Sequence, residues 1–133
     1  MVVVSTESVP IKSEPDVVTV RRRVREVSAQ LGLSLVDQTK IITAASELAR
    51  NTIIYGGGGS MQVQTLNGPR VGLRLTFEDH GPGIPDVELA LRDGFTTGSG
   101  LGLGLGGSKR LVNEFEIFSR PGEGTRITIT RWK

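Results

Sequence analysis

The chain has 133 residues, enough for one domain with a hydrophobic core of its own. It has no cysteine, which excludes a disulfide framework and a thiolate metal site. A net charge of +2, with aromatic residues at only 5% of the chain, does not indicate nucleic acid binding. No apolar run approaches the length of a membrane span. We therefore expect a cytoplasmic protein of one domain, residues 1–133, that binds neither nucleic acid nor membrane.

The first half of the chain predicts a short strand over residues 8–12 and then two helices. The first helix follows the capping residue Ser13 and ends at Gly32, and the second extends from Ser34 to about Tyr55. The apolar stripe of the first helix recurs at steps of three and four, through Val17, Val20, Val24, Val27 and Leu31. The core stripe of the second is Ile41, Ala45, Leu48 and Thr52.

The second half predicts four strands and two further helices. The strands cover residues 61–66, 71–78, 116–120 and 125–132, and the helices cover residues 87–92 and 104–113. Hairpin connections favour antiparallel pairing. This order of elements predicts a two-layer α/β sandwich, an α+β fold with a mixed, mostly antiparallel sheet and helices on one face.

Glu47 and Asn51 are four residues apart, so they project from one face of the second predicted helix. An amide oxygen such as that of Asn51 suits Mg²⁺, which prefers oxygen ligands and shares them with phosphates and water. The carboxylate of Glu47 could serve as a general base. By itself this pair is more typical of a solvated polar helix face.

A second candidate segment is the turn Asp79-His80-Gly81-Pro82-Gly83, which follows an apolar strand directly. Its glycines let the chain bend closely around a flat ligand, and a fixed Asp79 carboxylate could accept a hydrogen bond from an exocyclic amine such as that of adenine. An ordinary Asp/Gly/Pro turn is the alternative. His80 has no second histidine or cysteine beside it, which favours an exposed turn residue over a metal ligand.

Glycine and leucine alternate between Gly98 and Gly107, just before a predicted helix. Small residues expose backbone N–H groups that favour phosphate. The spacing of Gly102, Gly104 and Gly107 satisfies the dinucleotide-binding pattern, but no strand leads into it, and the order Ser108-Lys109 is wrong for a P-loop.

Taken together, these segments resemble the GHKL superfamily of Bergerat-fold ATP-binding domains, which includes histidine kinases, gyrase, Hsp90 and MutL. The resemblance rests on the order of Glu47-x-x-x-Asn51, Asp79-x-Gly81-x-Gly83, the glycine-rich loop and Gly124-Thr125. A narrower resemblance, carried by Ser46-Glu47-Leu48-Ala49-Arg50-Asn51 and Glu123-Gly124-Thr125-Arg126-Ile127, is to the RsbT-type serine-protein kinases of bacterial stress signalling. It extends over nearly the whole chain.

The resemblance implies a role for each matching residue. Glu47 would orient or deprotonate the attacking hydroxyl, Asn51 would coordinate Mg²⁺, and Asp79 would bind the adenine amine of ATP. Gly81 and Gly83 would shape the base pocket, and Thr125 would contact the base side. The phosphates would be wrapped by a lid formed by Gly100, Leu101, Gly102, Leu103 and Gly104.

The resemblance also implies protein partners. The substrate would be a serine or threonine of a small STAS-domain antagonist protein, of the RsbS or RsbR type, in a stressosome. The released kinase would activate a PP2C-type phosphatase. The alternative is an anti-sigma factor of the same fold, which acts mainly by sequestering a sigma factor. A MutL-type ATPase clamp would need a transducer domain that this sequence lacks.

Overall fold

The computed structural model describes residues 2–84, 86–91 and 104–133. In chain order these residues form β1 (Val2–Ile11), α1 (Glu14–Gln30), α2 (Leu35–Ile54), β2 (Gly59–Asn67), β3 (Gly72–Asp79), α3 (Val87–Ala90), α4 (Gly104–Arg110), β4 (Glu114–Arg120) and β5 (Gly124–Trp132). The predicted order of helices and strands is therefore confirmed.

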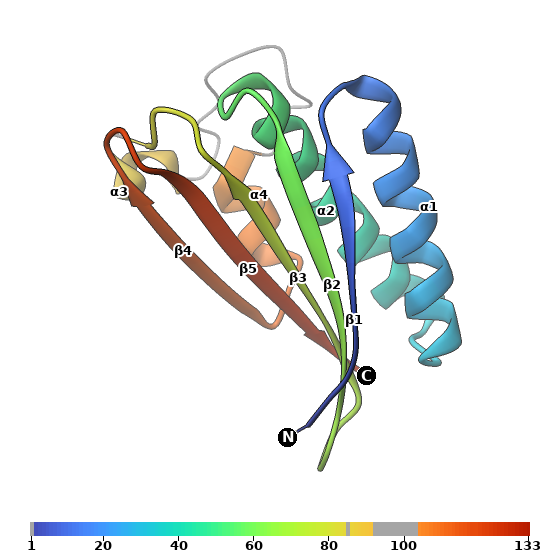
Figure 1. The fold of residues 1–133 in the computed structure, drawn as a ribbon. Helices are drawn as coiled ribbons and strands as arrows, with labels where there is room; N and C mark the ends of the chain where they lie inside the picture. The colour runs from blue at the N-terminus through green and yellow to red at the C-terminus, as the bar shows by residue number, and fades with distance from the viewer. Residues whose placement is uncertain (1, 85, 92–103) are drawn as a thin grey trace.

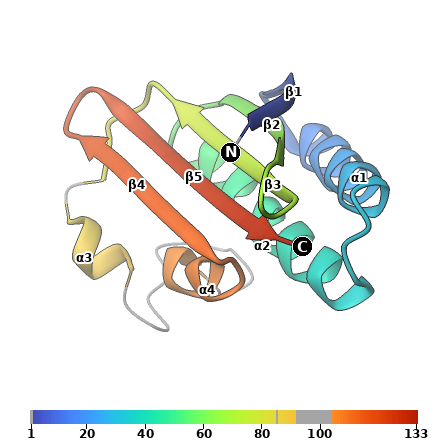
Figure 2. The same cartoon turned by 90° about the horizontal axis from the view of Figure 1, so that it is seen from below.

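The five strands form one sheet in the order β1-β2-β3-β5-β4. All four pairings are antiparallel, so the prediction of a mostly antiparallel sheet is confirmed, while "mixed" is wrong for the described strands. Helices α1, α2 and α4 lie on one side of this sheet (Figures 1 and 2). This arrangement confirms the two-layer α/β sandwich. None of the described helices combines the length and the apolar character that crossing a membrane requires.

Some predicted bounds are wrong. Strand β1 begins at Val2 rather than at residue 8, and pairs with β2 as far as Asn67 at its outer end. Its first five residues are exposed, so they carry no alternation that could reveal a strand. Helix α4 ends at Arg110, three residues before the predicted end, because the N–H of Asn113 already donates to the carbonyl of Thr130 as the chain enters β4.

The predicted helix starts are confirmed by their caps. Ser34 Oγ accepts a hydrogen bond of 3.1 Å from the N–H of Asp37 at the start of α2. At the start of α1, the carboxylate of Asp16 accepts from the N–H groups of Lys12 and Ser13, at 2.7 and 3.2 Å. These bonds satisfy N–H groups that have no partner within the helix.

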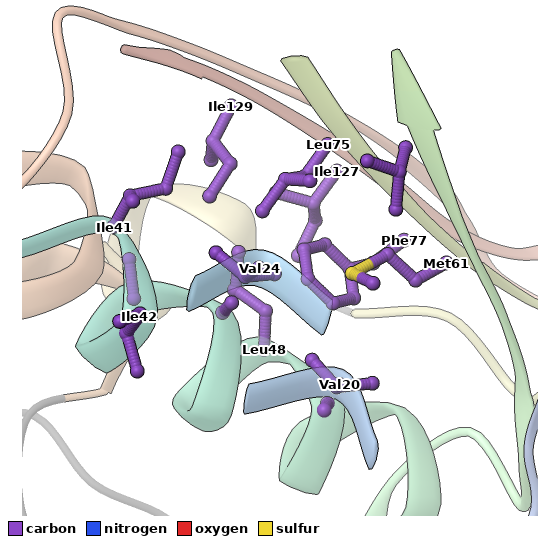
Figure 3. Close-up of a cluster of buried hydrophobic side chains, with 14 of the residues drawn as sticks. Val20, Val24, Ile41, Ile42, Leu48, Met61, Leu75, Phe77, Ile127 and Ile129 are labelled. Carbon is purple, nitrogen blue, oxygen red and sulfur yellow. The ribbon is translucent and has the colours of Figure 1, made fainter. Parts of the chain in front are cut away.

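The hydrophobic core fills the space between the sheet and the helices, as Figure 3 shows. The predicted stripe of α1 is buried apart from Leu31, which is half-buried, and all four residues of the α2 stripe are buried. Strand β3 contributes Leu73, Leu75 and Phe77 to this core, and Figure 3 shows Leu75 and Phe77 on the side of the sheet that faces the helices. Side chains alternate along a strand, so Asp79 continues this row and faces the helix layer at the end of β3.

Candidate nucleotide-binding site

The candidate site is built around Asp79, the last residue of β3. Its Oδ1 atom accepts a hydrogen bond of 2.9 Å from the N–H of Gly81, so the turn after the strand fixes the carboxylate. The side chain is half-buried, and its second oxygen, Oδ2, has no hydrogen-bond partner among the residues that the structure describes. One oxygen is therefore held by the protein, and the other remains able to accept.

A glycine segment after α2 lies directly against this carboxylate. A Cβ atom at Gly56 would be 2.5 Å from Oδ2 of Asp79, and a Cβ atom at Gly81 would be 2.7 Å from the Cα atom of Gly56. Only glycine allows these two backbones to approach so closely. This contact was not predicted from the sequence, because Gly56 and Gly81 are far apart in the chain.

Two glycines with left-handed backbones surround the same turn. Gly124 has a φ angle of +87°, and a Cβ atom there would meet the carbonyl oxygen of Asp79. Gly83 has a φ angle of +81°, and a Cβ atom there would meet the carbonyl oxygen of Arg120. The structure thus places Gly81 and Gly83 in contact with neighbouring backbone, where they set the path of the turn that holds Asp79.

Thr125 lies on β5 beside Asp79, as its partner in the strand register. Its hydroxyl is 2.9 Å from Ser119 Oγ, which also accepts a 2.7 Å hydrogen bond from the N–H of Ile84. A chain of hydrogen bonds therefore joins β5 to β4 and to the turn after β3. Ser119 was not predicted, since a single serine on a strand gives no local signal.

Glu47 and Asn51 lie on α2 with contrasting exposure. Glu47 is 3% exposed, which excludes the solvated helix face for this residue. Its Oε1 atom is buried without a hydrogen-bond partner among the described residues, and Nη1 of Arg50 lies 3.8 Å away. The side chain of Asn51 is half-buried, and its amide also has no partner in the described part of the chain. Both side chains therefore retain unused oxygen atoms.

Glu47 and Asn51 lie on the helix whose end leads to Asp79. The helix ends at Ile54, and Gly56 then contacts Asp79. At 1.5 Å per residue, Asn51 lies roughly 4–5 Å before Ile54 along the helix axis, and Glu47 roughly 10–11 Å before it. Helix α4 packs on α2, and its Leu105 joins the hydrophobic core. Gly104 is the first residue of α4, whereas Gly100, Leu101, Gly102 and Leu103 lie outside the described residues.

The chemistry of these groups fits Mg²⁺ and ATP. A free carboxylate oxygen at Asp79 can accept from an amino group, and the amide oxygen of Asn51 can bind Mg²⁺ if phosphate oxygens and water supply the other ligands. The unpartnered oxygen of Glu47 can accept from a hydroxyl. In a buried site, a polar atom without a partner is costly, which favours a ligand that completes it.

Known proteins are similar to this chain in sequence and in fold. Residues 36–133 match the family described as histidine kinase-, DNA gyrase B-, and HSP90-like ATPase. The chain is 46% identical over 125 residues to serine/threonine-protein kinase RsbT of Bacillus subtilis, covering 93% of this chain and 94% of that protein. It is 32% identical over 117 residues to the anti-sigma F factor of Thermoanaerobacter sp. (strain X514), covering 84% of this chain and 82% of the relative.

Two solved structures show the same fold at low identity. The RsbU and RsbW domains of a Mycobacterium tuberculosis protein superpose with a TM-score of 0.66 at 22% identity, covering 96% of this chain and 32% of that one. The mycobacterial sensor histidine kinase MprB gives a TM-score of 0.56 at 21% identity, covering 96% and 97%. With the match to the family and the identity to RsbT, the conclusion is that this chain belongs to the histidine kinase-, DNA gyrase B- and HSP90-like ATPases and, among them, to the RsbT-type serine/threonine-protein kinases.

Proposed function

We propose that this kinase transfers the γ-phosphoryl group of ATP to a serine or threonine of a small STAS-domain antagonist protein, of the RsbS or RsbR type, in a bacterial stressosome. The observation that supports this most is the buried carboxylate of Glu47, whose unpartnered oxygen lies one helical turn from the free amide of Asn51. A protein that only binds nucleotide has no need of such a carboxylate.

In this proposal the adenine amine donates to the free oxygen of Asp79, while the turn through Gly81 and Gly83 and the hydroxyl of Thr125 complete the base side. Bound Mg²⁺ would neutralise negative charge on the phosphates, with Asn51 as its protein ligand. The backbone of residues 100–104 would enclose the phosphates, as the family resemblance implies.

Glu47 acts on the acceptor hydroxyl. Its Oε1 atom accepts the hydroxyl proton as the serine or threonine oxygen bonds to the γ-phosphorus, and the bond from that phosphorus to the β–γ bridging oxygen breaks, which releases ADP. The protein contributes positioning, charge and one base, which is sufficient for phosphoryl transfer.

The proposed partners are those that the family resemblance implies. Once released from its STAS-domain substrate, the kinase would bind and activate a PP2C-type phosphatase. A second candidate function is sequestration of a sigma factor, because several relatives at 31–34% identity are named anti-sigma F factor. The higher identity to RsbT favours the stress-switch function. Pull-down with a sigma factor, a STAS-domain antagonist and a PP2C-type phosphatase would separate these two functions.

The experiment that tests the proposal measures phosphoryl transfer from labelled ATP, in the presence of Mg²⁺, to an RsbS-type STAS-domain protein. Glu47→Gln should lower the transfer rate by roughly 10²-fold or more, as expected for loss of a general base, and still bind ATP in calorimetry. Asp79→Asn should lose ATP binding and transfer together, and Asn51→Ala should abolish transfer.

Circular dichroism provides the control, since all three variants should keep the fold of the wild type. Transfer at the wild-type rate by Glu47→Gln would remove the assignment of the base. Full ATP affinity in Asp79→Asn would remove the adenine assignment instead.

A further inference from the structure

Arg50 lies on α2 one helical turn after Glu47, and its side chain reaches two carboxylates. Its Nη1 atom is 3.8 Å from Oε1 of Glu47, and its Nε atom is 3.6 Å from Oε1 of Glu14, the first residue of α1. The Arg50 side chain is 22% exposed, while that of Glu47 is 4% exposed. A guanidinium therefore lies next to the carboxylate that the proposed function requires.

The contact between Arg50 and Glu47 has an unusual form. Both facing atoms, Nη1 and Oε1, are buried and have no hydrogen-bond partner within the described residues. Their separation is too long for a hydrogen bond, so the two groups interact through charge alone. A paired, bidentate arginine would occupy the carboxylate oxygens, whereas this geometry leaves Oε1 free to accept.

The positive charge of Arg50 also reduces the free-energy cost of burying the Glu47 carboxylate. A buried carboxylate without a counter-charge is strongly disfavoured. Among the described residues, Arg50 provides the cationic side chain within 4 Å of Glu47. Arg50 can thus balance the charge of Glu47 without consuming its hydrogen-bonding capacity.

We infer that Arg50 is a positioning residue for phosphoryl transfer, which balances the charge of the buried Glu47 carboxylate and fixes its orientation while leaving Oε1 free for the acceptor hydroxyl. This inference rests on the proposed function, because it assigns Arg50 an action through the proposed base. Arg50 itself need not touch ATP or the acceptor.

A merely structural role is the competing explanation, in which Arg50 ties α2 to α1 through Glu14. The side chain of Glu14 is 70% exposed, and an exposed ion pair of this kind contributes little to stability. Because both carboxylates share one guanidinium, Glu14→Gln removes the structural contact and retains the contact to Glu47. It is therefore the matched control.

The test compares steady-state transfer from labelled ATP to an RsbS-type STAS-domain protein in several variants of the full chain. Arg50→Met keeps the apolar stem and removes the charge, and it should lower kcat by roughly tenfold or more with the KM for ATP within about twofold. Arg50→Lys should recover most of kcat, and Glu14→Gln should keep kcat within about twofold of the wild type.

A double-mutant cycle then asks whether Arg50 acts through Glu47. In the Glu47→Gln background, Arg50→Met should change the residual rate by less than about twofold, because the base that it positions is absent. An equal loss in both backgrounds would overturn the inference, and so would wild-type kcat in Arg50→Met. Should Arg50→Met fail to fold, Arg50→Gln takes its place in the same cycle.

The proposed function and this inference fail in different ways. If wild-type protein binds ATP but transfers no phosphoryl group to the STAS-domain protein, the proposed substrate fails, and the role of Arg50 in that transfer fails with it. If Arg50→Met transfers the phosphoryl group with the kcat of the wild type while Glu47→Gln has a much lower kcat, the proposed function stands and only the role of Arg50 is overturned.

Discussion

At the scale of single residues, the site depends on how closely the backbone surrounds one carboxylate. Asp79 is held by the N–H of its own turn, by Gly56 on one side and by Gly124 on the other. The Asp79-x-Gly81-x-Gly83 pattern was predictable because it is local. The contact of Gly56 was not predictable. Gly56-Gly57-Gly58-Gly59 directly follow a predicted helix, and glycines at that place are equally typical of a simple helix end.

Substitution of Gly56 tests this close packing. In Gly56→Ala the new methyl group would overlap the Asp79 carboxylate, which must move, so we expect ATP affinity to fall by roughly tenfold or more, equivalent to about 1.4 kcal/mol. Calorimetric titration with Mg²⁺-ATP measures this. The control is Gly57→Asn, because Gly57 has a left-handed φ angle that asparagine tolerates and open space around it. Equal affinity in Gly56→Ala and the wild type would contradict the role of Gly56.

Glu47 shows, also at the scale of single residues, that the apolar periodicity of α2 does not predict every buried side chain. The pattern of α2 placed Glu47 on a polar face, away from the stripe through Ile41 and Leu48, and yet the residue is buried. The reason is that α2 contacts α1, α4 and the sheet, so more than one face of this helix is covered. A sequence pattern predicts the face toward the largest neighbour and says little about the others.

At the scale of elements, the turn after β3 is fixed by strands that lie later in the chain. Ser119 on β4 accepts from the N–H of Ile84 and shares a hydrogen bond with Thr125 on β5. The predicted strands were close to correct, but which strand side chains bond to the turn depends on register. Register emerges only once β3, β5 and β4 have paired.

Removal of this hydroxyl tests the coupling. Ser119→Ala leaves the N–H of Ile84 without its partner, which should cost about 1–3 kcal/mol of stability and lower ATP affinity several-fold by loosening the turn. Urea denaturation and calorimetry measure the two effects. Thr128→Val is the control, because it removes a hydroxyl from the opposite face of the same sheet, where Thr128 lies 3.3 Å from the hydroxyl of Thr76. A comparable loss of ATP affinity in both variants would show that the effect is not specific to the turn.

At the scale of the whole molecule, the candidate nucleotide site and the hydrogen bonds of Arg131 to the helix layer lie at opposite ends of the sheet. Asp79 ends β3 beside Thr125, whereas Gly72, the first residue of β3, pairs with Trp132. Near that far end, Arg131 on β5 donates to Asp37 in the first turn of α2 and to the carbonyl of Leu111 just after α4. One arginine thus joins the sheet to both helices that carry or flank the site.

The order of the elements was predictable from the sequence, whereas some of their bounds were not. Caps and stripes are local, so the start of α2 at Ser34 followed from sequence. The far ends depend on long-range partners: β1 extends to Val2 because β2 is there to pair with it, and α4 ends early because β5 captures Asn113. Tertiary hydrogen bonds decide such bounds.

The Asp37–Arg131 link also predicts how stability depends on pH. The hydrogen bond from Arg131 lowers the pKa of Asp37 below its ordinary value of 3.8, against a smaller opposing effect of burial. Since the folded-state pKa is the lower one, the stability from this link is fully present above pH 3.8 and is lost as the pH falls through the folded-state value.

Asp37→Asn tests this dependence, because asparagine cannot ionise. We expect a lower thermal midpoint than that of the wild type at pH 7. The difference should narrow as the pH falls from 3.8 through the lower folded-state pKa, below which Asp37 is protonated in both states. Thermal denaturation followed by circular dichroism at a series of pH values measures it, with Glu26→Gln as the control for an exposed carboxylate whose nearest cation, Arg23, is 4.0 Å away. A difference that stays constant from pH 7 into strong acid would mean that Asp37 stabilises the fold by packing, and that its charge contributes nothing.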